Sequence, residues 1–170
     1  MKNLSKTFVI TFALVASSSL FAQTKNIVET AAGSESHTTL VAAVKAADLV
    51  GVLSSEGPFT VFAPTNDAFS KLPEGTVDTL LKTENISTLQ AILKYHVVSG
   101  KFMAADVVGL INKNNGKAMI PTVYGENLTA TLKDGSVYIT DAKGNSAKVI
   151  AADLNNTNGV IHVLDTVLLP

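Results

Sequence analysis

Three histidines and three aspartates are the residues of this chain whose chemistry could support catalysis or metal binding: His37, His96, His162, Asp67, Asp153 and Asp165. An imidazole titrates near neutral pH and can act as a general base, and two neighbouring carboxylates can act as an acid–base pair. The histidines are far apart in the sequence, no acidic residue stands at ligand spacing from them, and the chain has no cysteine. The pattern therefore predicts no metal site, no cofactor and no catalytic centre.

Each histidine has a structural interpretation that we favour. His96 follows an amphipathic segment, and we expect it to be partly buried and hydrogen-bonded to a loop carbonyl or to a side chain of residues 65–67. His162 alternates with apolar residues on one strand face, which indicates a core or sheet-edge position. His37 lies in a polar run at a helix start, so we expect it to face solvent.

Charge and residue usage exclude one large class of partners. All 13 basic residues are lysines, and beyond the first 22 residues 11 lysines stand against 14 acidic residues, a net charge near −3. Nucleic-acid recognition favours a basic surface and the bidentate fork of arginine. A weakly acidic domain without arginine is therefore not expected to bind nucleic acid.

Residues 1–22 have the pattern of a secretory signal peptide. Lys2 and Lys6 precede an apolar run over residues 8–16, and small residues lead to a cleavage point that we place after Ala22. The apolar run is shorter than the about 20 residues that a membrane-spanning helix needs, although a retained membrane anchor is the alternative. We expect a secreted or periplasmic protein with no integral membrane span after signal removal.

The remaining chain, residues 24–170, predicts one α+β domain. Residues 57–73 read as a turn, a buried strand, a proline corner and a short helix capped by Thr65. Helical patterns cover residues 26–33, one continuous stretch of 36–53, and a segment before Tyr95 with Ser87 and Gln90 as a capping box. Period-two patterns follow, with Asp134-Gly135 as a hairpin turn and residues 160–164 as a central strand, so we expect helices first and antiparallel strands later.

Three segments in this order resemble the fasciclin-like domain family: residues 57–73, Tyr95-His96 with the following 97–101, and residues 158–170. The resemblance covers nearly all of residues 24–170. It implies a wedge of about seven β-strands with several short helices packed around it. It also implies a secreted or surface-displayed, non-enzymatic adhesion module that binds a protein or glycan on a cell or matrix surface.

The same resemblance supplies the candidate binding residues Asp153, Leu154, Tyr95 and His96. In some animal members a Glu-Pro-Asp-Ile-Met segment is implicated in integrin binding, and here residues 151–155 read Ala-Ala-Asp-Leu-Asn, so the aspartate matches and the leucine is close. Tyr95-His96 matches the tyrosine–histidine motif of the family. Because some members bind carotenoids or related molecules, the alternative function is a carrier of a small apolar ligand such as a carotenoid or lipid. A hydrolase is the third hypothesis.

Overall fold

The computed structural model describes residues 24–170, so the predicted signal peptide, residues 1–22, lies outside the described residues. Seven strands form one sheet in these residues: β1 (Phe59–Pro64), β2 (Val97–Ser99), β3 (Lys117–Pro121), β4 (Asn127–Lys133), β5 (Ser136–Thr140), β6 (Ser146–Asn156) and β7 (Gly159–Leu164). Their order in the sheet is β2-β1-β7-β6-β5-β4-β3. A bridge between Val98 and Thr122 brings the two ends of the sheet together, so the sheet almost closes on itself.

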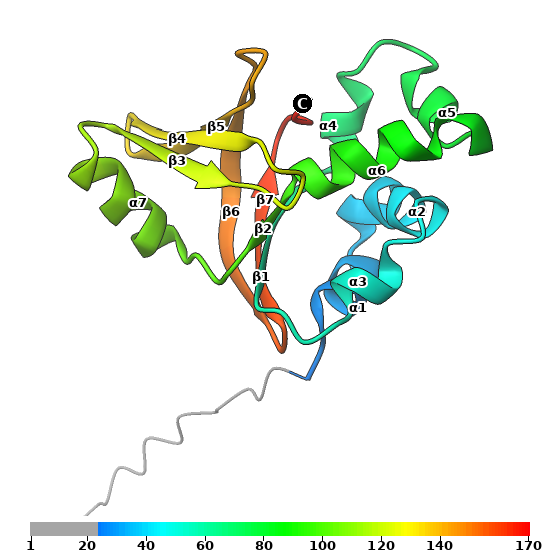
Figure 1. Ribbon diagram of the computed structural model, residues 1–170, viewed down its shortest axis with the longest axis horizontal. Coiled ribbons are helices and arrows are strands. Elements are labelled where there is room, and N and C mark those ends of the chain that lie inside the picture. Colours follow the sequence, from blue (N-terminus) through cyan, green and yellow to red (C-terminus); the bar gives the residue numbers. More distant parts are fainter. Residues whose placement is uncertain (1–23) are drawn as a thin grey trace, which may run out of the picture.

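Short helices cover two sides of this sheet: α1 (Ile27–Ala32), α2 (Thr38–Ala46), α3 (Val50–Leu53), α4 (Asn66–Ser70), α5 (Thr76–Leu80), α6 (Ile86–Tyr95) and α7 (Ala104–Lys113). Two 3₁₀ turns, Glu35–His37 and Thr83–Asn85, precede α2 and α6. Figure 1 shows α1 to α6 gathered on one side of the molecule and α7 alone on the other, below β3 and β4. The predicted α+β class with seven strands and several short helices is confirmed.

The two helical sides enclose two apolar clusters. One lies between α1–α6 and strands β1, β2 and β7, and includes Leu40, Leu93 and Ile161. The other lies between α7 and the β3–β6 part of the sheet, and includes Ile111, Leu128 and Tyr95. Alternate side chains of β3 and β4 are buried because successive residues of a strand point to opposite faces. All six residues of β7 are buried, which confirms its predicted central position.

Several local predictions are confirmed by the hydrogen bonds of the backbone. Thr65 caps α4, since its Oγ1 accepts from the Ala68 N–H at 3.2 Å. Asp134 and Gly135 form the turn between β4 and β5 with φ values of 51° and 75°, the left-handed region that this two-residue turn requires.

Two other local predictions are wrong. The predicted continuous helix over 36–53 is instead a 3₁₀ turn followed by α2 and α3. The break between α2 and α3 lies at Asp48, whose φ is 55°. Gln90 makes no capping box with Ser87, because its Nε2 donates to the Ala47 carbonyl at 2.8 Å. The later strands β3 to β7 pair antiparallel as predicted, and β1, for which the sequence predicted no partner, pairs with β7 in parallel.

His37 is also placed differently from its prediction, because it is buried with 7% exposure. Its Nδ1 lies 2.8 Å from Ser34 Oγ, and its Nε2 has no hydrogen-bond partner among the residues that the structure describes. Burial lowers the pKa of His37, and the Ala63 carbonyl acts in the opposite direction. The ring of His37, the last residue of the 3₁₀ turn, is therefore buried and neutral near pH 7.

Candidate functional site

Tyr95 ends α6 and lies in the interior, with 0% exposure. Its hydroxyl accepts from the Ala142 N–H at 2.9 Å, in the turn between β5 and β6. Its ring meets the ring of Tyr124 edge-on, with 6.3 Å between the centroids. Burial is the main cause that raises the pKa of Tyr95, and the negative charges of Asp141 and Glu126 add to it. Tyr95 thus joins α6 to the β5–β6 turn.

His96 follows Tyr95 and is equally buried, with 2% exposure. Its Nδ1 lies 2.8 Å from the Ile92 carbonyl, and its Nε2 accepts from the Leu168 N–H at 3.0 Å. A carbonyl only accepts and a backbone N–H only donates, so the ring is neutral with its proton on Nδ1. Burial lowers the pKa of His96 to about 4. An imidazole held in this way is unsuited to act as a general base near neutral pH.

The partners of His96 differ from the expected ones. The carbonyl belongs to helix α6 rather than to a loop, and no side chain of residues 65–67 bonds to the ring in the described residues. The backbone of His96 is bonded to β1 instead, because its carbonyl accepts from the Phe62 N–H at 2.9 Å. The side chain of His96 instead holds the C-terminal segment against α6.

Asp141, which was not among the residues predicted to form the site, completes this interior arrangement. It is 6% exposed, and its carboxylate accepts from the Lys143 N–H at 2.9 Å and the Asn145 N–H at 2.8 Å within the β5–β6 turn. The same carboxylate accepts from the Leu169 N–H at 3.0 Å. The Asp-x-x-Gly-Asn sequence of residues 141–145 is the signal that could have found it, since an aspartate often accepts from the backbone a few residues ahead.

Asp153 lies on the opposite side of the molecule from α6, in an irregular part of β6. The β6–β7 register shifts between Val149 and Ala151 and again between Ala151 and Leu154, and Asp153 has a φ of 60°. Its Oδ1 accepts from the Ala104 N–H, the first residue of α7, at 2.7 Å. A carboxylate is favourable there because the N-terminus of a helix carries partial positive charge. We call residues 150–154 the β6 bulge.

His162 holds the β6 bulge in place, a role that the sequence did not reveal. The sequence predicted a core or sheet-edge position, and the structure places the residue in the core. The ring is 2% exposed and stacks on Phe62 with 5.6 Å between centroids. Its Nδ1 accepts from the Asp153 N–H at 3.3 Å, and its Nε2 lies 2.7 Å from the Phe102 carbonyl. These partners place the proton on Nε2. His162 therefore ties the β6 bulge to the segment before α7.

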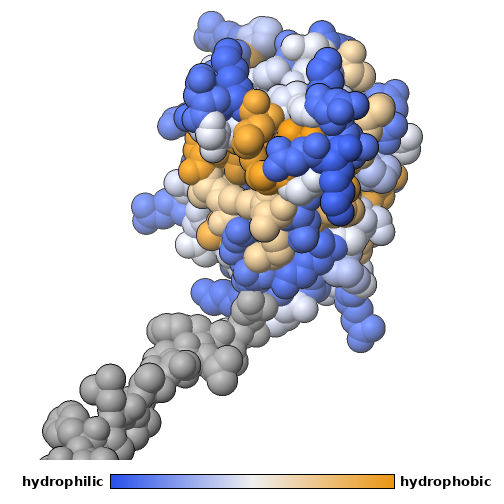
Figure 2. Space-filling view, turned by 90° about the vertical axis from the view of Figure 1, so that its left-hand side faces the viewer, coloured by the Kyte–Doolittle hydropathy of each residue, from blue (hydrophilic) through white to orange (hydrophobic). Residues whose placement is uncertain are grey.

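A groove of about 200 Å³ lies beside the β6 bulge, between α7 and strands β5, β6 and β7. Phe62 and His162 are part of its lining, with Val107, Val137 and Val149. On the side of the molecule that carries α7, apolar residues gather in the middle of the surface with hydrophilic residues around them (Figure 2). Two apolar side chains of the bulge itself reach solvent, since Ile150 is 52% and Leu154 39% exposed.

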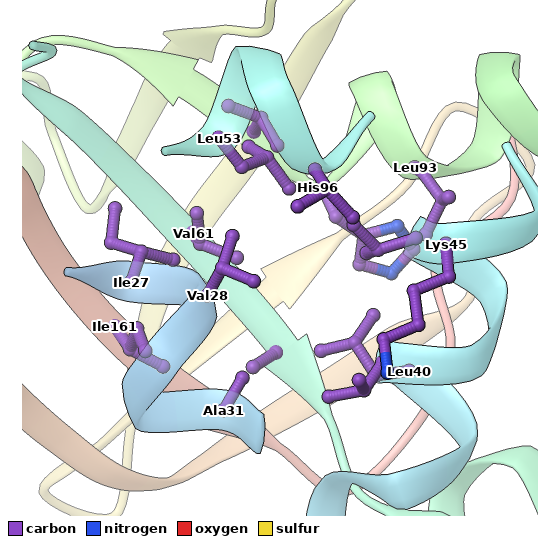
Figure 3. A pocket seen from close by; sticks show the side chains of 15 residues that line it. Ile27, Val28, Ala31, Leu40, Lys45, Leu53, Val61, Leu93, His96 and Ile161 are labelled. Carbon is purple, nitrogen blue, oxygen red and sulfur yellow. The ribbon is translucent and has the colours of Figure 1, made fainter. Parts of the chain in front are cut away.

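A second, narrower opening lies on the other side of the sheet. Figure 3 shows the residues of α1, Ile27, Val28 and Ala31, facing Leu40 and Leu93, with Lys45 at the edge. The lining surface is apolar, and the cavity volume is only about 30 Å³. We call this opening the α1 slot. Sites for drug-sized ligands measure roughly 300–1,000 Å³, so in this conformation the α1 slot is too small for such a ligand.

Two further features bear on the function. Among residues 24–170 no three His, Asp or Glu side chains come together in a way that could hold a metal ion. None of the helices in that part of the chain is long and apolar enough to cross a membrane.

Comparison with known proteins identifies the family. The sequence profile of the fasciclin domain matches residues 35–170. This chain belongs to the fasciclin domain family. The predicted resemblance is thereby confirmed.

Relatives and a solved structure extend this result. Protein sll1483 of Synechocystis sp. is 56% identical over 144 residues, which cover 85% of this chain and 73% of that protein. Immunogenic protein MPB70 of Mycobacterium bovis is 41% identical over 138 residues, covering 78% of this chain and 63% of MPB70. A fasciclin domain pair from the insect cell adhesion molecule Fasciclin I shares the fold, with a TM-score of 0.76 at 19% identity, covering 86% of this chain and 51% of the pair.

Proposed function

We propose that this fasciclin domain is a secreted or surface-exposed, non-enzymatic adhesion module that binds a protein or glycan on a cell or matrix surface through the β6 bulge. The observation that carries the proposal is the way the β6 bulge is held. Asp153 has a left-handed backbone, its N–H donates to His162, and two further hydrogen bonds tie Asp153 and His162 to Ala104 and Phe102 around the start of α7. Strained backbone held by its surroundings is a recurring feature of binding sites.

Within this proposal the four candidate residues have two different tasks. Leu154 reaches solvent and contacts the partner together with Ile150. Asp153 orients the β6 bulge through Oδ1, and its Oδ2 has no hydrogen-bond partner in the described residues, which leaves it available to a donor on the partner. Tyr95 and His96 act from the interior, where they hold the scaffold in one conformation.

Membership of the fasciclin domain family supports the adhesive function, and the predicted signal peptide supports a secreted or periplasmic location. The fold neighbour Fasciclin I is a cell adhesion molecule. Residues 1–22 carry the charged and apolar segments of a secretory signal. We propose that this segment directs export and is removed, after which the domain acts in the periplasm or outside the cell.

Binding of the purified protein to whole cells and to extracted surface polymers tests the proposal. We expect Ile150→Ser with Leu154→Ser to weaken surface binding at least about tenfold, as truncation of exposed apolar anchors does at other interfaces. Val52→Ser is the matched control, because Val52 is 51% exposed but lies in α3, among the helices on the other side of the sheet. Wild-type binding by the double variant would contradict the proposal.

A carrier of a small apolar ligand is the second candidate, and the α1 slot is the observation that favours it. A carotenoid or lipid would have to move α1 away from α2, because the slot holds only about 30 Å³. An organic extract of the purified protein should then contain a pigment or lipid in stoichiometric amount, and Ala31→Leu, which narrows the slot, should abolish it. A colourless, lipid-free extract from the wild-type protein would rule this candidate out.

A further inference from the structure

The side of β3–β6 that points away from α7 has a charge pattern unlike that of the whole domain. Strand alternation places on it twelve residues, three of them lysines and none acidic: Lys117, Met119, Pro121, Asn127, Thr129, Thr131, Lys133, Ser136, Tyr138, Thr140, Ser146 and Lys148. We call this surface the lysine face. The chain beyond residue 22 has more acidic residues than lysines, so a face without carboxylates is a local feature.

The strand register fixes where the charges lie on the lysine face. Lys117, Thr131, Tyr138 and Lys148 are successive partners across β3, β4, β5 and β6. Neighbouring strands are about 4.8 Å apart, so the backbones of Lys117 and Lys148, at the two ends of this row, are separated by about 14 Å across the sheet. Lys133 lies opposite Ser136, one outward position further along β4. The three lysines therefore surround Tyr138 and Thr131.

These lysines have no carboxylate partner within the described residues. Among residues 24–170 ion-pair geometry is found only between Lys71 and Asp165. Two acidic residues lie at the ends of the strands: Asp134 stands in the β4–β5 turn next to Lys133, and Asp165 follows β7, where its Oδ1 accepts from the Lys148 N–H. The face thus offers unpaired positive charge to a partner.

The other residues of the lysine face match the chemistry of sugars. Hydroxyl groups of Thr129, Thr131 and Thr140 stand on adjacent strands, and Thr140 Oγ1 and Ser146 Oγ lie 2.8 Å apart. An open hollow of about 560 Å³ borders the row, lined by Asn114, Lys117, Met119 and Thr129. Amides and hydroxyls can bond to sugar hydroxyls, and the aromatic ring of Tyr138 can pack against the apolar face of a sugar ring.

We propose that the lysine face binds an acidic polysaccharide, with Lys117, Lys133 and Lys148 pairing its carboxylates and Tyr138 contacting a sugar ring. The inference rests on the proposed adhesive function and names a partner class for it, on a surface distinct from the groove beside the β6 bulge. Three lysines fall short of the clusters of four to eight basic residues typical of anionic-lipid recognition. Without arginine the face also lacks the usual means of reading nucleic acid.

Immobilised alginate, a polyuronate, is the probe, with neutral dextran as the comparison. The wild-type protein should bind alginate and not dextran, and binding should weaken as salt screens the charges. Lys117→Gln, Lys133→Gln and Lys148→Gln together should lower the affinity at least about tenfold, since exposed ion pairs each contribute up to about 1 kcal/mol. The matched control changes three exposed lysines elsewhere, Lys25, Lys45 and Lys82, to Gln, with the same change in net charge.

Tyr138→Ala tests whether the lysine face makes a specific contact with the sugar in addition to attracting its negative charge. It leaves the charge unchanged and should still lower alginate affinity several-fold, with the melting temperature of every variant measured as a check of folding. Equal losses in the two lysine triple variants, equal binding to dextran, or binding to phosphatidylglycerol vesicles without binding to alginate would each overturn the proposal. Binding of the wild type to whole cells is measured in parallel. If the protein binds cells but not alginate, only the proposal for the lysine face is rejected. If it binds neither cells nor alginate, the proposed adhesive function is rejected as well.

Discussion

His96 and His162 occupy opposite sides of the sheet and make the same kind of connection with opposite tautomers. Each ring is 2% exposed, and each has one backbone carbonyl and one backbone N–H as partners. The proton is on Nδ1 in His96 and on Nε2 in His162. His96 joins helix α6 to the C-terminal segment inside the core, whereas His162 holds the β6 bulge at the surface.

The difference shows how one residue type can serve stability in one region and presentation in another. Around His96 the bonds run between segments that are themselves buried, so losing them leaves polar groups without water. Around His162 the N–H of Asp153 belongs to an exposed residue, and water can replace part of what is lost. We therefore expect the His96 region to control global stability and the His162 region to control the local order of the bulge.

Removing the His96 ring should give the largest effect. His96→Ala leaves the Ile92 carbonyl and the Leu168 N–H without partners and opens a cavity, so we expect a loss of about 2–4 kcal/mol in the free energy of unfolding. The melting temperature should fall by roughly 5–15 °C, measured by calorimetry. An unchanged melting temperature would show that the hydrogen bonds of the His96 ring do not control global stability.

The pH dependence of stability should come next. The folded pKa of His96, about 4, lies below its ordinary value of 6.5, so the unfolded chain binds the proton more readily. Stability should therefore be full above pH 6.5 and fall by up to about 3 kcal/mol as the pH drops to 4, with His37 acting in the same direction because its pKa is also lowered. Urea unfolding of His96→Gln, which cannot titrate, should show a clearly weaker dependence, and an identical slope would contradict this assignment.

His162→Ala should have a smaller effect on stability and a larger one on local order. We expect a loss of about 1–2 kcal/mol, with amide hydrogen exchange of residues 150–155 at least about tenfold faster. His96→Ala is the comparison, since under strongly stabilising conditions it should leave exchange in the β6 bulge unchanged. If both variants loosen the bulge equally, the two regions are not independent.

The smallest effect should come from Asp153 itself. Asp153→Ala removes the acceptor for the Ala104 N–H and places a non-polar residue at a φ of 60°, so we expect a loss of about 1 kcal/mol. Asp153→Asn keeps an oxygen acceptor and a residue type that tolerates left-handed backbone, and should stay within about 0.5 kcal/mol of the wild type by urea unfolding. An equal loss in the two variants would show that the negative charge, rather than the oxygen acceptor, matters.

Local sequence signals predicted a large part of the fold. Thr65 as a helix cap, Asp134-Gly135 as a hairpin turn and residues 160–164 as a central strand depend on neighbours within a few residues, so their patterns were sufficient. The register of three segments also predicted the family, which the profile match confirms. The break at Asp48 was missed because a positive φ at a single residue leaves no mark on helical periodicity.

The candidate site was predicted only in part. Asp153 and Leu154 came from resemblance alone, and nothing local in residues 151–155 shows that Asp153 caps a helix 49 residues earlier. Asp141 and His162 were not selected as organising residues, because the partners that make them so are distant in sequence. The lysine face likewise appears only once the register places Lys117, Tyr138 and Lys148 in one row.

By itself, the sequence determined most of the helices and strands, the family to which the chain belongs, and that His162 lies in the core or at a sheet edge. The tertiary structure alone decided what the buried histidines hold, since their partners lie 72 residues away at Leu168 and 60 residues away at Phe102. The physical reason is that helices, turns and strands follow from short-range sterics and hydrophobic periodicity. Hydrogen bonds between distant backbone groups exist only after hydrophobic packing has brought their segments together.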